Sequence, residues 1–207
     1  IKGMRSTLPG GLLSIALLVL FLLLAYQLLL SYRDKVRTAE LSTRNYAAIF
    51  EARLDATLRR TDADLKALAS EIPFAALNQS AVPRFAQDLN ADLDSRLFNV
   101  EEMTGYRVHD ANGDTLYSSN RAQVPNVNIA DRAYFKQLRD GPGSGLLFSD
   151  VLIGRSTNRQ VMVIARALRD DHGRFMGIVH GMLDLEYYTR QFSSLDLGTQ
   201  GVVALHR

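Results

Sequence analysis

The sequence of 207 residues contains no cysteine, which excludes disulfides, thiolate zinc sites and cysteine catalysis. It also lacks a strong excess of either charge. The formal net charge is +2, and Lys and Arg are interleaved with Asp and Glu, so no basic stripe is available to follow a phosphate backbone. We therefore expect no nucleic acid as a partner. The length suits one sizeable domain and a further segment, but not an additional complete catalytic module.

Motifs for catalysis and for metal binding are missing as well. The four histidines have no paired spacing typical of metal ligands, and no Ser, His and Asp arrangement accompanies a nucleophile elbow. The glycine cluster at 141–145 precedes an apolar strand rather than a helix N-terminus, which indicates a connector and not a phosphate loop. The sequence thus predicts no catalytic site, no metal and no cofactor.

One long segment lacks charge altogether. No charged residue lies between Ser6 and Tyr32, and residues 12–30 are almost wholly Leu, Ile, Val, Ala and Phe. A helix that spans the bilayer needs about 20 apolar residues. A cleaved signal peptide would end in a small-residue cleavage site, which 27–33 does not offer, so an uncleaved anchor is favoured.

We therefore expect a cytoplasmic N-terminal tail at residues 1–11 and a transmembrane helix at 12–32, in contact with a lipid bilayer. Lys2 and Arg5 precede this span, and three basic residues follow it closely. The charges on the two sides consequently do not fix its orientation.

Two helices are predicted at 33–102. No Pro or Gly interrupts 32–72, where apolar residues recur at helical spacing between charged ones, which indicates a long stalk helix. The stalk either packs on its own domain or forms a dimerising rod, and both interpretations stay open. Pro73 ends it. Pro83 lies near the start of a second helix that runs to about Phe98 or Glu102.

Beyond residue 103 the apolar pattern alternates, which predicts strands. A strand through Tyr106 and Val108, a turn at 110–114 and a strand at 115–117 come first. A short helix that Asp131 could cap follows. Strands at 146–152, 160–168 and 175–183 form an antiparallel meander. Asp184 is placed to cap a helix at 186–192, and a last strand is predicted at 201–205.

The order of these elements and three short motifs resemble the Cache family of sensors. The motifs are 131–135 (DRAYF), 154–157 (GRST) and 177–184 (GIVHGMLD). The similarity is to the PDC, or PAS-like, membrane-distal module of double-Cache receptors. It implies an α+β fold with an N-terminal transmembrane helix, a long stalk helix, and a PAS-like antiparallel sheet with flanking helices. The sensor domain would occupy 103–207, truncated at its C-terminal end and placed outside the inner membrane.

The resemblance also implies a small-ligand pocket over the sheet. The helix of the DRxYF motif would supply Arg132, Tyr134 and Phe135. A guanidinium can bind a carboxylate through two parallel hydrogen bonds, and aromatic walls strengthen that pair by excluding water. The alternative is an arginine that binds loop carbonyls and two aromatics that fill the core. The two interpretations stay open at this stage.

Two departures from amino-acid-binding relatives bear on the ligand. Those relatives have Trp-Tyr in place of Tyr134 and Phe135, and an Asp in place of Met182. Without that acid an ammonium group would lose its water without compensation, so a free amino acid is disfavoured. His180 shares a strand face with Met182 and is a further candidate, either for an anion or as a histidine satisfied by a neighbour. Asp150 lies near another pocket position of the family.

The resemblance predicts the extracytoplasmic small-ligand sensor domain of a bacterial transmembrane signalling receptor. We expect a small-molecule ligand, with a carboxylate as the leading class, and a homodimer. The expected output is a diguanylate cyclase, followed by a histidine kinase or a chemotaxis transducer as alternatives. A dimerisation scaffold that binds no ligand is a second class of function.

Overall fold

The computed structural model describes residues 8–98, 100–120, 127–143 and 145–193. It has the predicted α+β composition and divides into two compact units, residues 1–53 and 54–207. Helix α1, Leu8–Glu71, is continuous over 64 residues and so contributes to both units. Its end confirms the prediction that Pro73 terminates the long helix, because proline has no amide hydrogen and clashes with the preceding turn.

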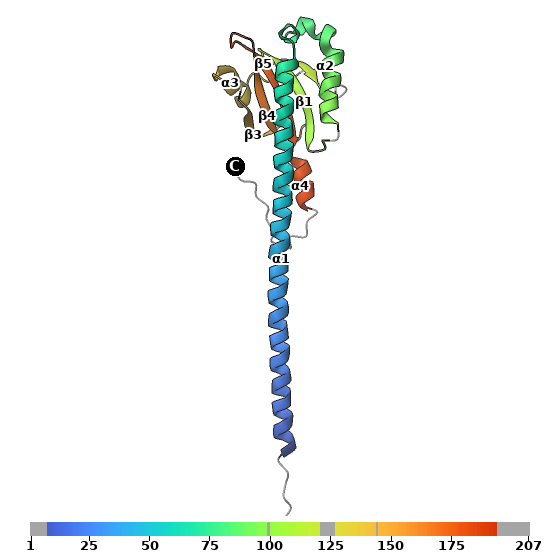
Figure 1. Cartoon of the computed structure of the whole chain (residues 1–207), viewed down its shortest axis with the longest axis vertical. Coiled ribbons are helices and arrows are strands. Elements are labelled where there is room, and N and C mark those ends of the chain that lie inside the picture. Colours follow the sequence, from blue (N-terminus) through green and yellow to red (C-terminus); the bar gives the residue numbers. More distant parts are fainter. Residues whose placement is uncertain (1–7, 99, 121–126, 144, 194–207) are drawn as a thin grey trace, which may run out of the picture. The chain divides into compact units, whose positions relative to one another are not determined.

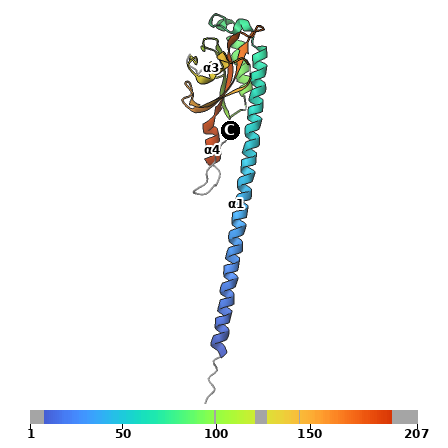
Figure 2. The ribbon, with the colours of Figure 1, turned by 90° about the vertical axis from the view of Figure 1, so that its left-hand side faces the viewer.

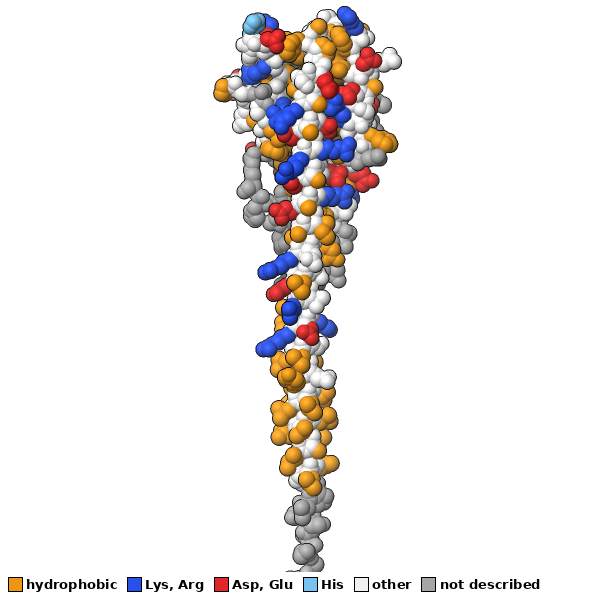
Figure 3. All heavy atoms as spheres, viewed as in Figure 1, with side chains coloured by type: hydrophobic (Ala, Val, Ile, Leu, Met, Phe, Trp, Pro, Cys, Tyr) orange, Lys and Arg blue, Asp and Glu red, His pale blue; other side chains and the backbone are white. Residues whose placement is uncertain are grey.

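The first unit is the N-terminal part of α1. Its best 18-residue window has a mean hydropathy of 2.6 and no buried residue, so this one helix of the described chain is long and apolar enough to cross a membrane. Figure 3 shows apolar side chains around its lower part, followed by a mixture of charged side chains further along the helix.

The second unit is built on an open sheet of five strands (Figure 1). The strand order is β2-β1-β5-β4-β3, and every neighbouring pair is antiparallel. The strands are β1 (Met103–Asp110), β2 (Thr115–Ser118), β3 (Leu147–Ile153), β4 (Gln160–Arg169) and β5 (Phe175–Asp184). The predicted hairpin and meander are therefore confirmed. The strand predicted at 201–205 lies outside the described residues.

The helices of this unit divide between the two faces of the sheet. The last turns of α1, helix α2 (Val82–Leu97) and helix α4 (Leu185–Ser193) share one core cluster with it, on what we call the α1 face. Two short 3-10 turns, Phe74–Ala76 and Gln79–Ala81, connect α1 to α2. Helix α3, Ala133–Asp140, packs on the opposite side, the α3 face (Figure 2). The alternating side chains of a strand supply both cores.

Polar contacts complement the apolar packing on the α1 face. The Tyr106 hydroxyl donates to Asp64 Oδ2 at 3.0 Å, and Arg166 of β4 forms an ion pair with Asp62. Arg96 of α2 bonds with Glu71 at 2.6 Å. The C-terminal part of α1 is therefore fixed to the sheet by polar contacts at defined residues as well as by apolar packing.

Two carboxylates were expected to cap helices, with different outcomes. Asp184 Oδ1 accepts hydrogen bonds from the amides of Glu186 and Tyr187, so its prediction as the cap of α4 is confirmed. The prediction for Asp131 is wrong. Arg132 occupies the N-cap position of α3 without a side-chain cap, and Asp131 is instead paired with Arg155 at 2.5 Å. A bidentate guanidinium competes effectively with backbone amides for a carboxylate.

Gly177 is required by the sheet itself. It has φ +147°, and a Cβ at this position would lie 2.0 Å from the His109 carbonyl oxygen of β1.

We expect Gly177→Ala to lower the free energy of unfolding by about 2 kcal/mol or more, since the cost of the strained backbone and the cost of the steric overlap add. Gly173, φ +76° in the β4–β5 turn, has open space around it and is the control. Gly173→Ala should cost about 1 kcal/mol. Urea unfolding of the detergent-solubilised chain measures both, and equal losses would contradict the overlap argument.

Candidate ligand-binding site

Helix α3 carries the DRxYF motif and is fixed by its apolar side. Tyr134, Phe135 and Leu138 are buried on the α3 face of the sheet. Their spacing places all three on one side of the helix, as expected for an amphipathic helix on a sheet. Arg132 precedes the helix in extended backbone, with φ −70° and ψ 138°. Its side chain therefore leaves from the loop rather than from the helix surface.

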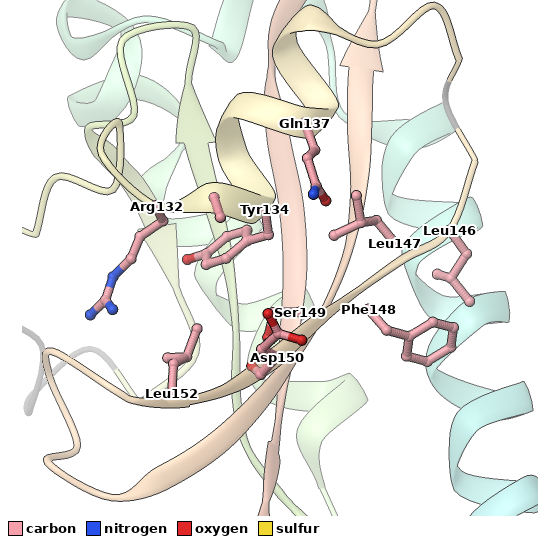
Figure 4. Close-up of a pocket in the computed structure, with 10 residues that line it drawn as sticks. Arg132, Tyr134, Gln137, Leu146, Leu147, Phe148, Ser149, Asp150 and Leu152 are labelled. Carbon is pink, nitrogen blue, oxygen red and sulfur yellow. Dashed lines mark hydrogen bonds between the residues drawn. The ribbon is translucent and has the colours of Figure 1, made fainter. Parts of the chain in front are cut away.

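A cleft of about 500 Å³ lies between α3 and β3. Polar groups enter it from both elements, and Figure 4 shows Tyr134 between Arg132 on one side and Gln137 on the other, with Ser149 and Asp150 across from them on β3. The remaining lining residues are Ala133, Leu146, Leu147, Phe148 and Leu152. The cleft combines apolar walls with a few polar groups, as small-molecule sites generally do.

Three of the six candidate residues line this cleft, namely Arg132, Tyr134 and Asp150. Arg132 also donates from Nη2 to the Ile153 carbonyl oxygen at 3.1 Å, which is the kind of contact that the structural interpretation of this arginine required. That bond occupies one nitrogen of the guanidinium. A guanidinium has five N–H donors, so the contact leaves others for a ligand.

The other three candidates lie deeper. Phe135 is fully buried and packs edge to face on Phe175, with 5.6 Å between ring centroids. His180 and Met182 lie on the α3 face of β5, and both are buried. Tyr134 stacks over His180 with a centroid distance of 6.1 Å. None of these three is among the residues that line the cleft, although Tyr134 connects the cleft to His180.

His180 is paired with a second buried histidine. Its Nε2 lies 3.2 Å from Nε2 of His109, which is on the adjacent strand β1. Burial lowers the pKa of His109 to about 3, with Arg107 adding to the effect against the Gly113 carbonyl. Burial also lowers the pKa of His180 well below its ordinary value, reinforced by His109 and Arg107. Both imidazoles are accordingly neutral at physiological pH.

Tyr134 is surrounded by arginines. Burial raises the pKa of its phenol to about 12, and this outweighs the opposing influence of Arg132, Arg107 and Arg155. The hydroxyl therefore remains protonated and can donate a hydrogen bond. Asp131, which is paired with Arg155, opposes the arginines, and Asp150 lines the same cleft. The cleft therefore presents charges of both signs beside a neutral phenol donor.

Sequence reasoning missed Arg107 and His109. Both point to the α3 face from β1, where Arg107 is paired in register with His180. A recess of about 390 Å³ opens at Arg107, next to Ser119 and Ser156. The sequence did carry one signal, because Arg107 and His109 are two ionisable residues inside a predicted strand. The strand that pairs with β1 could not be predicted, because β1 pairs with β5 across a long connection.

Comparison with known proteins gives structural neighbours. No protein-family model and no curated protein sequence matches the chain. The ligand-binding domain of the Campylobacter jejuni chemoreceptor Tlp3 in complex with 4-methylisoleucine has a TM-score of 0.55 at 13% identity, covering 70% of this chain and 56% of that one. The ligand-binding domain of Mlp24 with asparagine has a TM-score of 0.52 at 12% identity, covering 72% and 56%.

A third neighbour is the extracellular domain of a protein named as the histidine kinase rpHK1S-Z16. It is 24% identical, covers 70% of this chain and 61% of that one, and has a TM-score of 0.47. This chain spans little more than half the length of the domains it matches. The second unit has the same fold as the ligand-binding domains of Tlp3 and Mlp24, and the predicted α+β fold with an antiparallel sheet is confirmed.

The buried histidine pair predicts a pH dependence of stability. Unfolded imidazoles bind protons below about pH 6.5, whereas the buried ones do not, so unfolding takes up protons. Stability contributed by this pair is present above pH 6.5 and is lost as the pH falls from there toward about 3, the folded pKa of His109. Each histidine contributes a slope of roughly 1.4 kcal/mol per pH unit.

Replacing His109 with glutamine should remove about one histidine's share of this slope, measured by urea unfolding between pH 6.5 and 4.5. The control is His172→Gln, because His172 lies exposed in the β4–β5 turn. Equal slopes in the wild-type chain and the His109 variant would refute the assignment.

Proposed function

We propose that the chain is the extracytoplasmic ligand-sensing part of a bacterial transmembrane signalling receptor. The observation that carries the proposal is the cleft of α3 and β3, where Arg132 and the protonated Tyr134 meet in a fold known from sensory domains. The ligand-binding domains of this fold from Tlp3 and Mlp24 have been solved with 4-methylisoleucine and asparagine, respectively. The apolar segment of α1 supports an anchor in the membrane, with residues 1–11 on its cytoplasmic side, 12–32 spanning it and 103–207 forming the sensor.

The sheet provides a physical path from such a ligand to α1. Tyr134 and His180 lie on the α3 face, whereas Leu65 and Leu68 of α1 are buried on the opposite face. β5 carries side chains to both faces, since alternate residues of a strand point in opposite directions. A ligand that binds one arrangement of these layers more tightly than another shifts α1 between them, and only that difference in affinity can do so.

For the output we favour a diguanylate cyclase, with a histidine kinase or a chemotaxis transducer as the alternatives. This order rests on the resemblance of the sequence alone, because one fold serves many outputs. We further propose the bacterial inner membrane as the location and a homodimer as the working form.

A scaffold that only dimerises is the second candidate. It is favoured by Met182, which replaces the acid that holds an ammonium group in amino-acid-binding relatives and is buried in the α3-face core. A scaffold needs no occupant in the cleft. Ligand binding distinguishes the two functions.

The test is a thermal-shift screen of carboxylates and amines on the detergent-solubilised chain. We expect a carboxylate at 100 times its Kd to stabilise the chain by about 2.7 kcal/mol. Arg132→Ala should remove this shift while leaving the melting temperature of the ligand-free chain nearly unchanged, because Arg132 is only partly buried and its bond to the Ile153 carbonyl is exposed. Arg139→Ala, at the exposed end of α3, is the matched control. A chain that no compound stabilises is a scaffold, and full binding by the Arg132 variant excludes the assigned cleft.

A further inference from the structure

Arg107 is a buried cation without a counter-charge. Its side chain is on the α3 face of β1, and the residue is only 6% exposed. Nη2 donates to the Ser156 hydroxyl of the β3–β4 loop, while Nε is buried and has no hydrogen-bond partner in the described part of the chain. Within the same described residues it forms no ion pair, and burial lowers the pKa of its guanidinium, with the Tyr134 phenol as the one opposing group.

The other inward-facing arginines of the sheet and α2 have carboxylate partners. Arg166 is paired with Asp62, and Arg96 is surrounded by Asp64, Glu71 and Asp92. A buried charge is costly unless it is paired and fully hydrogen-bonded. At Arg107 a neutral serine hydroxyl stands where these arginines have carboxylates. The position is therefore suited to an anion that does not belong to the chain.

The histidine pair next to it supplies a second unsatisfied atom, whose polarity follows from the hydrogen-bond network. Nδ1 of His109 faces the Gly113 carbonyl oxygen at 3.2 Å, so this nitrogen carries the proton. Nε2 of His109 is then an acceptor and receives a hydrogen bond from Nε2–H of His180. Nδ1 of His180 is left with a lone pair, and it is buried with no partner among the described residues. It requires a donor.

The two unsatisfied atoms belong to neighbouring residues. Arg107 and His180 are directly opposite each other in the β1–β5 ladder, on the same face of the sheet. Cβ atoms in such pairs are about 5 Å apart. Tyr134 stacks over His180 and acts electrostatically on Arg107, and the recess of about 390 Å³ opens beside the latter. A small molecule held at Arg107 in this recess would lie beside His180, the strand partner of Arg107.

We infer that Arg107 and His180 form the anion and hydroxyl subsites of a ligand site at this recess, which shares no lining residue with the cleft at Arg132, and that the ligand class is a small hydroxycarboxylate. Arg107 binds the carboxylate in place of the Ser156 contact, and the ligand hydroxyl donates to His180 Nδ1. The inference rests on the proposed sensor function and names the chemistry of its ligand.

An amino acid could in principle satisfy the same two atoms, since an ammonium group also donates. The charges decide against it. The recess is lined by Arg107, Arg159 and Arg190 against Glu101 and Asp184, and Asp184 is already paired with Arg159. An ammonium group at His180 would add a positive charge beside the Arg107 guanidinium, which forms no ion pair within the described residues. A neutral hydroxyl provides the donor without a second positive charge in this region.

The experiment uses two sets of three probes, and within each set the probes differ only in carrying a hydroxyl, a hydrogen or an amino group on the same carbon. The three-carbon set is L-lactate, propionate and L-alanine, and the four-carbon set is L-malate, succinate and L-aspartate. Calorimetry on the detergent-solubilised full chain gives each Kd. We expect the hydroxy acid of at least one set to bind about tenfold more tightly than the acid without a hydroxyl, because the latter leaves His180 Nδ1 unpaired. It should also bind about tenfold more tightly than the amino acid.

Variants assign the two subsites. Arg107→Met should weaken the hydroxy acid by about tenfold or more, while the ligand-free chain melts no lower than the wild type, because an uncompensated buried charge has been removed. His180→Phe should remove the preference for the hydroxyl but retain binding of the unsubstituted acid. Arg139→Gln, an exposed cation at the end of α3, is the control and should change neither affinity.

The outcomes separate the two levels of the argument. Tight binding of some other ligand that is insensitive to Arg107→Met overturns the inference and leaves the sensor function intact. Equal affinities within each set overturn the hydroxyl subsite, and a ligand-free Arg107→Met chain that melts well below the wild type shows that the arginine is structural. A chain that binds none of these probes and no compound of the wider screen overturns both proposals.

Discussion

The second unit depends on burying both faces of one sheet, and β5 bears most of that constraint. Eight of its ten residues are buried, and it pairs with β1 on one side and β4 on the other. Glycine at 181 lets the layers approach, since a Cβ there would meet Met103, Tyr106 and Thr61 of β1 and α1 at 2.6–3.3 Å. Close packing of this kind makes the sheet a stiff partition between two cores.

Much of this architecture could be predicted from periodicity and from proline and glycine positions. The end of α1 at Glu71, the extent of α2 and the three strands of the meander follow from patterns that local chemistry enforces. The cap of α3 could not be predicted. Whether Asp131 binds backbone amides or Arg155 depends on where the β3–β4 loop comes to lie, which is a matter of tertiary contacts.

The candidate site shows the same division. Arg132 and Tyr134 were found through a local motif, and they lie together because one short helix carries both. Arg107 and His180 are 73 positions apart in the sequence and became neighbours only through the β1–β5 register. Such a pair can be identified only once the strand pairing is known, because a register shift of one residue would place the two side chains on opposite faces of the sheet.

The polar contacts between α1 and the sheet restrict how that helix can move. Asp62 binds Arg166 of β4, and Asp64 binds the Tyr106 hydroxyl of β1, so two strands on either side of β5 each grip a carboxylate of the same helical turn. Sliding along the helix axis would break both contacts at once. Tilting of α1 about this turn would lengthen one of the two contacts while shortening the other. Tilting is therefore the less costly displacement of the helix.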